Sequence, residues 1–185
     1  MPRIIPEYRH RYPAVELVLE EATSIDIARK LAAGELDVGL VRLPLLEIAA
    51  IDTRSIDPDE LYAALPDASP FADRDTVDLA ALAAEPFVLQ SRISVLHSIT
   101  LTACHDAGFV PIVAQEAAQL SAVLALVRSG LGVALVPSRA ARAVPHGVTL
   151  VRLARRVAIE TGVALPRGGG SPVARNFAAI AIDSD

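Results

Sequence analysis

Residues 3–42 alternate between segments with the apolar pattern of a helix and segments with the apolar pattern of a strand. Apolar residues at helical intervals in residues 3–12 predict an amphipathic helix. Val15 to Glu21, rich in β-branched residues and leucine, predicts a strand, and Asp37 to Arg42 predicts a second, short and buried one. Between them, Thr23 to Asp26 matches a capping box that opens a helix, and Gly34 is the expected C-cap. This succession is typical of a βαβ unit.

The rest of the chain continues the alternation of strands and helices. Further strands are predicted at Leu61–Leu65, Phe87–Gln90, Pro111–Glu116, Val133–Val136, Val148–Leu153 and Val157–Leu165. Helices are predicted at Val77–Ala84, Leu96–Ala107, Ala117–Ser129 and from Ser171-Pro172 through Ile182. Gly108 and Gly130 are the expected stops of the two longer helices. The pattern favours an α/β protein.

Composition narrows the class of protein. Of the 185 residues, 52% are hydrophobic but only 4% are aromatic, which predicts a globular fold with an aliphatic core. The net charge of −5 argues against nucleic-acid binding by this chain itself. The single Cys104 excludes an internal disulfide, no basic-then-apolar leader precedes the first helix, and no apolar run approaches the ~20 residues of a membrane span, so we expect a cytoplasmic location.

Two strand-to-helix junctions could bind an anion. A helix that begins at Thr23 and Ser24 offers hydroxyls and unpaired backbone N–H groups, and the loop from Gln90 to Ser94 repeats this arrangement in the second half of the chain. Taken alone, each junction is better explained by simple capping or by an ordinary polar loop, and the case for binding comes from their pairing. Arg42, at the exit of a buried strand, lies either at a ligand site or at a strand end that reaches solvent.

The sequence lacks the motifs of an enzyme. Gly130-x-Gly132 leaves a helix and enters a strand, which is the reverse of a dinucleotide-binding loop, so a helix stop explains it better. Cys104 and His105 are adjacent in a predicted helix and point to different sides; Cys104 is expected to be a core residue and the four histidines to lie on the surface. Zinc spacings, a nucleophile elbow and a P-loop are absent, so we predict no catalytic residue, no metal and no cofactor.

Several segments, taken together, resemble the effector-binding domain of LysR-type transcriptional regulators. In the first half these are Tyr12-Pro13-x-Val15-x-Leu17, Glu21-Ala22-Thr23-Ser24 and Leu31-x-x-Gly34-Glu35-Leu36-Asp37-Val38-Gly39-Leu40. In the second half they are Glu85-Pro86-Phe87-Val88-Leu89, Ala107-Gly108-Phe109-x-Pro111, Gln115-Glu116-Ala117-x-Gln119 and Val127-x-x-Gly130-Leu131-Gly132-Val133-Ala134-Leu135-Val136-Pro137. The resemblance covers nearly the whole chain, and residues 115–119 look most like the subgroup that controls aromatic catabolism.

The resemblance implies a type II periplasmic-binding-protein fold, with two Rossmann-like lobes that hold the ligand in a cleft. Residues 1–57 and 162–185 would form lobe one and residues 58–161 lobe two, and the family's first strand, with the hydroxyl-bearing loop after it, is expected to be missing. By position, the implied ligand-binding residues are Thr23, Ser24, Arg42, Ser94, Val95, Leu96 and Gln119.

The resemblance also implies partners and a mechanism. An aromatic acid or a dicarboxylate would shift the population of lobe arrangements in a homodimer or homotetramer, and DNA would be contacted only through an amino-terminal winged helix-turn-helix that this chain lacks. In that dimer, the helix at residues 4–12 of one subunit pairs with the helix at residues 117–129 of another. The alternatives are a transporter's solute-binding protein for a small carboxylate, or an enzyme on a similar two-lobed scaffold.

Overall fold

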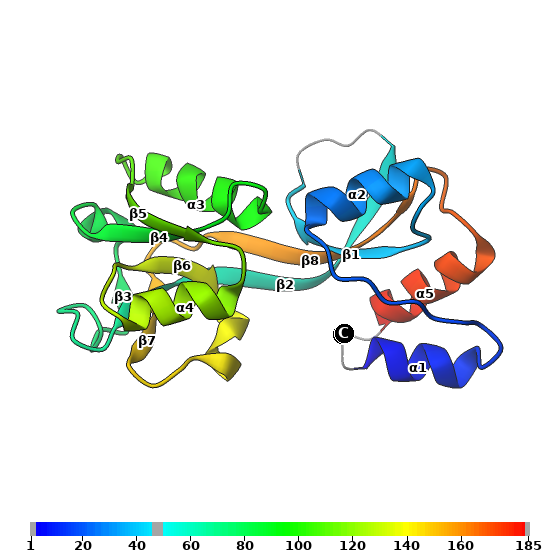
Figure 1. Ribbon diagram of the computed structural model, residues 1–185, viewed down its shortest axis with the longest axis horizontal. Helices are drawn as coiled ribbons and strands as arrows, with labels where there is room; N and C mark the ends of the chain where they lie inside the picture. The colour runs from blue at the N-terminus through cyan, green and yellow to red at the C-terminus, as the bar shows by residue number, and fades with distance from the viewer. Residues whose placement is uncertain (1–2, 46–49, 184–185) are drawn as a thin grey trace. The chain divides into compact units, whose positions relative to one another are not determined.

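The computed structural model describes residues 3–45 and 50–183, in which the chain divides into two compact units (Figure 1). Unit 1 comprises Met1–Pro58 and Glu160–Asp185, and unit 2 comprises Asp59–Ile159. The chain passes from unit 1 to unit 2 along the long strand β2 (Ile51–Pro66) and returns along β8 (Ala158–Pro166). Each unit therefore has its own core and is described separately.

Unit 1 is a small sheet covered by helices on both faces. Besides parts of β2 and β8, its elements are α1 (Ile4–Arg11), α2 (Ser24–Ala33), β1 (Gly39–Leu43) and α5 (Pro172–Asp183). β1 runs antiparallel to β8 and its residues alternate between two cores. Val41 packs with Leu31 of α2, whereas Leu40 packs on the other face with Tyr8 of α1 and Phe177 of α5. Strand alternation thus fixes which helix covers which face.

The predicted strand at Val15–Glu21 is wrong. The structure has an extended loop here, with Val15 and Leu17 packed against the core of α1 and α5 while Val18 and Leu19 are 84% and 67% exposed. The residue composition of this segment suits a strand, but a strand requires a neighbour to complete its ladder of hydrogen bonds. No described strand pairs with this segment.

Unit 2 contains two connected sets of strands. Its elements are β3 (Thr76–Val77), η1 (Leu79–Leu82), β4 (Pro86–Gln90), α3 (Val95–Asp106), β5 (Ile112–Ala117), α4 (Leu120–Arg128), β6 (Ala134–Pro137), η2 (Ser138–Ala143) and β7 (Val148–Leu153). β2 lies between antiparallel β6 and β7, and β3 pairs with β7 in parallel. β4 and β5 are parallel, and a bridge from Phe87 to Val133 connects them to the residues before β6. The core between strands and helices is almost wholly aliphatic.

Several predicted boundaries shift. The strand predicted at Leu61–Leu65 is the end of the much longer β2, and the helix predicted at Val77–Ala84 is the single 3₁₀ turn η1, with Val77 in β3. The helix predicted from Ala117 begins at Leu120, because Ala117 still belongs to β5. The apolar pattern could not distinguish the end of a strand from the first turn of the helix that follows.

Candidate functional site

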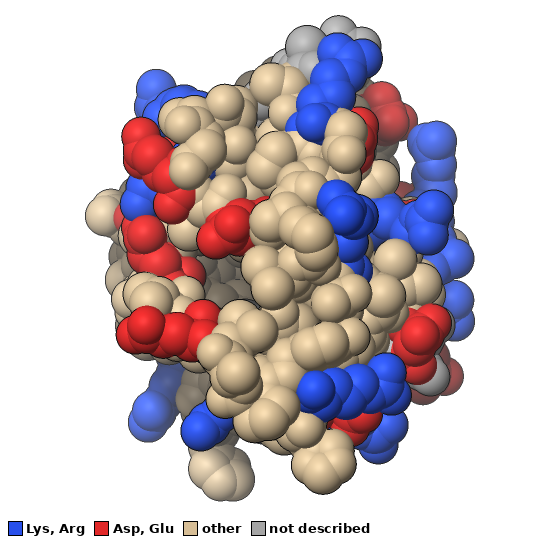
Figure 2. Space-filling view, turned by 90° about the vertical axis from the view of Figure 1, so that its right-hand side faces the viewer, with Lys and Arg blue, Asp and Glu red and all other residues tan. Residues whose placement is uncertain are grey.

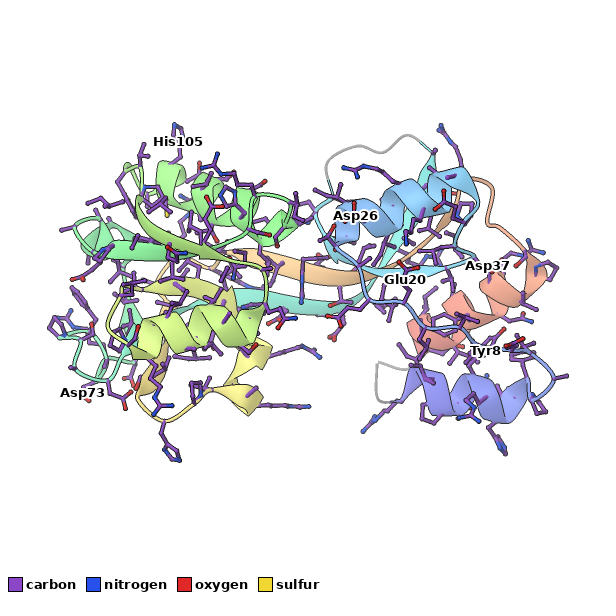
Figure 3. All side chains as sticks on the ribbon, in the orientation of Figure 1. Tyr8, Glu20, Asp26, Asp37, Asp73 and His105 are labelled. Carbon is purple, nitrogen blue, oxygen red and sulfur yellow. The ribbon has the colours of Figure 1, made fainter. Side chains whose placement is uncertain are left out.

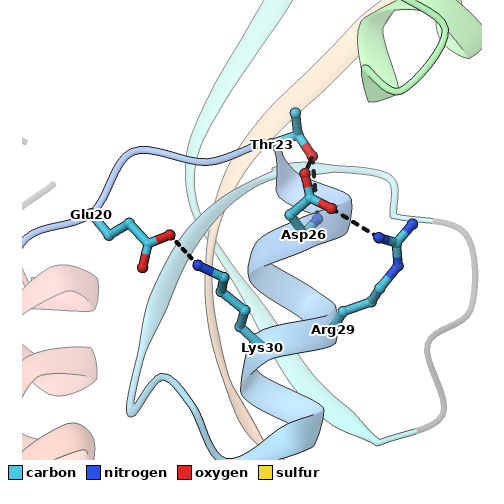
Figure 4. Close-up of polar contacts among 5 residues, drawn as sticks. All are labelled: Glu20, Thr23, Asp26, Arg29 and Lys30. Carbon is cyan, nitrogen blue, oxygen red and sulfur yellow. Dashed lines mark hydrogen bonds and ion pairs between the residues drawn. The ribbon is translucent and has the colours of Figure 1, made fainter.

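The predicted capping box is confirmed at the start of α2 (Figure 4). The Thr23 hydroxyl accepts a hydrogen bond from the backbone N–H of Asp26 at 3.2 Å and donates one to the Asp26 carboxylate at 2.7 Å. The Asp26 carboxylate also forms an ion pair with Arg29 at 2.9 Å. Nearby, Lys30 forms an ion pair with Glu20, and this contact raises the pKa of the Lys30 ammonium. The protein's own carboxylate therefore already holds the hydroxyl proton of Thr23.

Of the two hydroxyls, that of Ser24 is better placed than that of Thr23 to donate a hydrogen bond to a ligand. Its Oγ accepts a hydrogen bond from the backbone N–H of Arg42 at 2.9 Å, which ties the start of α2 to β1. A hydroxyl that accepts one bond still carries a proton to donate. Among the described residues, no acceptor for the Ser24 proton is found. The backbone N–H groups of Ser24 and Ile25 lie in the first helical turn, where intrahelical acceptors are lacking.

The side chain of Arg42 on β1 contacts Thr161 on the neighbouring strand β8. Arg42 of β1 is directly opposite Thr161 of β8, and the guanidinium Nη1 donates to the Thr161 hydroxyl at 3.3 Å. Thr161 was not among the predicted site residues. It follows Glu160 in β8, and its partner is 119 residues away in the sequence, so no sequence pattern gives that register. Thr23, Ser24 and Arg42 are thus brought together in unit 1, with Thr161 added; we call these four residues the unit 1 half-site.

The four predicted residues of the second half also lie together, within unit 2. Ser94 is the N-cap of α3, which Val95 and Leu96 open, and Gln119 is the N-cap of α4. Both helices begin just after the carboxyl ends of the parallel strands β4 and β5, where ligands bind in open α/β sheets. A hydrogen bond of 2.9 Å from the Ser91 N–H to the Ala117 carbonyl connects the two loops. Ser94, Val95, Leu96 and Gln119 are called the unit 2 half-site below.

Within the unit 2 half-site, the backbone groups are not equivalent. The Ser94 hydroxyl accepts the N–H of Leu96 at 3.3 Å, so that N–H has a partner inside the protein. The N–H of Val95 is the first of the helix and lacks an intrahelical acceptor. The side chain of Gln119 makes no capping bond and is exposed. Val95 and Gln119 are therefore the members with polar groups most accessible to a ligand.

Side chains that could act as a nucleophile or a metal ligand lie outside the two half-sites. Cys104 is fully buried, as predicted, and burial raises the pKa of its thiol to about 11, which keeps it protonated and unreactive. The neighbouring His105 points outward from α3 with its side chain 85% exposed (Figure 3). In the part of the chain that the structure describes, no cluster of metal-ligating side chains occurs. Over the same residues, no helix has both the length and the apolar character that crossing a bilayer demands.

On the face shown in Figure 2, the surface charges are mixed rather than gathered by sign. Figure 2 views the molecule from the side on which α1 and α5 lie in Figure 1, and it shows Lys and Arg interspersed with Asp and Glu. A surface that grips phosphates needs a continuous excess of Lys and Arg. This face of the chain does not have one.

Comparison with known proteins shows the family. The profile described as "LysR substrate binding domain" matches residues 1–184. The HTH-type transcriptional regulator AlsR of Bacillus subtilis is 29% identical over 181 residues, which cover 96% of this chain and 59% of AlsR. The chain covers 51% and 50% of two further curated relatives, so it spans roughly half the length of the regulators it matches. The chain belongs to the LysR substrate-binding domain family.

Solved structures agree with this assignment. The BenM effector-binding domain with its effector benzoate has a TM-score of 0.84 and 22% identity, covering all of this chain and 85% of that one. The QuiR effector-binding domain in complex with shikimate has a TM-score of 0.88 and 16% identity, covering 99% and 88%. The predicted type II periplasmic-binding-protein fold is confirmed. The relatives are regulators, which supports effector binding in a regulator over solute binding for a transporter.

Proposed function

We propose that this chain binds a small organic acid and passes the binding event to the DNA-binding part of a longer LysR-type regulator. The single observation that carries the proposal is the unit 1 half-site. There, the Ser24 hydroxyl lies at a helix N-terminus and accepts a hydrogen bond from the backbone N–H of Arg42, and its own proton has no acceptor among the described residues. Hydroxyl, helix N-terminus and guanidinium are the groups that recognise a carboxylate.

The acid is proposed to be an aromatic acid or a dicarboxylate. BenM and QuiR are described with benzoate and shikimate, two carboxylates on six-membered rings. We propose that the two units are the family's two lobes and that the unit 2 half-site, through Val95 and Gln119, contacts the rest of the effector. Whether the two half-sites share one ligand across a cleft stays a prediction. No titratable pair supports catalysis in either half-site, and we propose that the chain is not an enzyme.

The proposed regulator acts in the cytoplasm as a homodimer or homotetramer, with α1 of one subunit against α4 of another. Exposed apolar side chains lie next to both helices: Val18 and Leu19 follow α1, and Ile112 and Val113 precede α4. Unit 1 also has an open groove of about 490 Å³ between α1 and residues 13–19. In this arrangement a Val18→Asp substitution lowers the mass measured by light scattering to that of a monomer; an unchanged mass would refute this contact.

A thermal-shift screen tests the proposed function. Benzoate, shikimate and a six-carbon dicarboxylate are each added at millimolar concentration to the 185-residue chain. At a concentration 100 times the Kd, an acid adds about 2.7 kcal/mol of stability, which raises the melting temperature by roughly 5–11 °C in a domain of this size. If none of the acids moves the midpoint more than sodium chloride at equal ionic strength, the proposal fails.

A further inference from the structure

Gln90 is a polar residue buried at the end of an otherwise apolar strand. It is the last residue of β4 and is only 4% exposed. Its Nε2 donates to the Leu135 carbonyl of β6 at 3.2 Å, which orients the side-chain amide. Among the described residues, no group donates to its Oε1, and this oxygen is not one of the unpartnered atoms that are sealed from solvent. A buried amide oxygen normally has a donor, so this acceptor is open to a ligand.

The Gln90 side chain lies on the face of β4 that α4 covers. Side chains alternate along a strand, and Val88, two residues earlier, belongs to the same buried cluster as Val123 of α4. In the register of β4 with β5, Gln90 is directly opposite Ala117, which packs against that cluster too. Ala117 ends β5, and α4 begins shortly afterwards at Leu120. The Gln90 amide and the start of α4 therefore lie at the same end of this strand pair and on the same face.

The start of α4 provides hydrogen-bond donors that the protein does not use. The N–H of Val123 is the first that donates along this helix, to the Gln119 carbonyl at 3.1 Å. The side chain of Gln119 makes no capping bond. The N–H groups of Leu120, Ser121 and Ala122 therefore have no acceptor among the described residues. An unused acceptor on β4 and unused donors on α4 thus face the same end of unit 2.

We infer that Gln90 and the start of α4 bind a hydroxyl group of the effector, which is then a hydroxylated carboxylic acid. This inference rests on the proposed function. The Gln90 Oε1 accepts the hydroxyl proton, and an N–H of the first turn of α4 donates to the hydroxyl oxygen. A carboxylate would bring its negative oxygens against Oε1, and an ammonium would face the positive end of the helix. A neutral hydroxyl both donates and accepts, so it satisfies both sides. An acid without a hydroxyl leaves Oε1 covered and unpaired, which weakens binding.

Titration calorimetry with acids that differ only in hydroxyl groups tests this inference. One series is benzoate with meta- and para-hydroxybenzoate, and the other is cyclohexenecarboxylate with shikimate. In at least one series, the wild type is expected to bind a hydroxylated acid roughly tenfold or more tightly than its hydroxyl-free counterpart. Gln90→Met keeps the length of the side chain but removes the acceptor, so the preference should fall to about twofold or less. Gln115→Met, at an exposed position of β5, is the matched control and keeps the preference.

A second measurement needs only the wild type, in case Gln90→Met does not fold. The side-chain amide signals of Gln90 in nitrogen-15 NMR should shift with the hydroxylated acid and not with its hydroxyl-free counterpart. The inference is overturned if both acids shift these signals equally, or if Gln90→Met keeps the preference. Binding of only hydroxyl-free acids, a six-carbon dicarboxylate included, overturns the inference and leaves the proposed function standing. If the wild type binds no acid at all, the proposed function fails and the inference fails with it.

Discussion

The backbone at Gly132 leaves no space for a side chain, which gives a sharp test of the unit 2 core. The chain passes β4 here, with the Val133 N–H donating to the Pro86 carbonyl and the Val88 N–H donating to the Val133 carbonyl, both at 2.8 Å. A Cβ added at Gly132 would lie 2.2 Å from the carbonyl oxygen of Pro86 and 2.8 Å from its carbonyl carbon. These are backbone atoms, so a rotamer change cannot relieve the clash.

The expected loss for Gly132→Ala follows from these contacts. Overpacking a well-filled interior costs about 1–3 kcal/mol. Separating the two segments far enough also weakens two hydrogen bonds, each worth about 1 kcal/mol. Together these give a decrease of roughly 3–5 kcal/mol in the free energy of unfolding. For a chain of 185 residues, this lowers the melting temperature by roughly 6–20 °C.

Gly130→Ala is the matched control for this prediction. Gly130 has a φ of +77° and nothing within 4 Å of an added Cβ, so alanine there meets only backbone strain of about 1–2 kcal/mol. Thermal melts followed by circular dichroism should therefore rank the wild type above Gly130→Ala and Gly130→Ala above Gly132→Ala. A Gly132→Ala variant that melts at or above the temperature of Gly130→Ala would refute the reasoning.

Two further predictions concern a thiol and a helix cap. Because burial raises the pKa of the Cys104 thiol from its ordinary value of 9.0 to about 11, the unfolded chain releases the thiol proton first as the pH rises, and the stability conferred by burial declines between about pH 9 and pH 11. Urea melts should show a steeper decline over that range for the wild type than for Cys104→Ala, and a thiol reagent at pH 8 should label only unfolded protein; rapid labelling of folded protein would contradict this. Thr23→Ala removes the cap of α2 and should lower stability by about 1 kcal/mol, whereas Thr23→Ser changes it little. Equal urea midpoints for both variants would count against the cap.

The features that sequence predicted well are set by local backbone chemistry. Gly34 and Gly130 end their helices with positive φ, and Ser171 caps α5 through its hydroxyl, because these requirements involve only a few adjacent residues. The two half-sites could be anticipated for the same reason, since Ser24 and Ser94 each stand where a helix begins after an extended segment.

The features that sequence missed depend on pairing across long distances. Residues 15–21 have the composition of a strand, but composition does not provide a neighbouring strand. Thr161 reaches the half-site only through its register with Arg42, which is set by the passage of the chain through the whole of unit 2. The sequence alone predicts that both hydroxyls of the capping box, those of Thr23 and Ser24, bind the ligand. The structure shows Thr23 committed to Asp26 and favours Ser24, a distinction that requires side-chain geometry.

Titration calorimetry of benzoate with the wild type and with Ser24→Ala tests the carboxylate site most directly. The lost bond would join a hydroxyl to a charged group, so Ser24→Ala should weaken the Kd by roughly tenfold or more. Ser55→Ala, at an exposed position of β2, should bind as the wild type does. Equal affinities for the wild type and Ser24→Ala, with the acid bound by both, would contradict a carboxylate site at the start of α2.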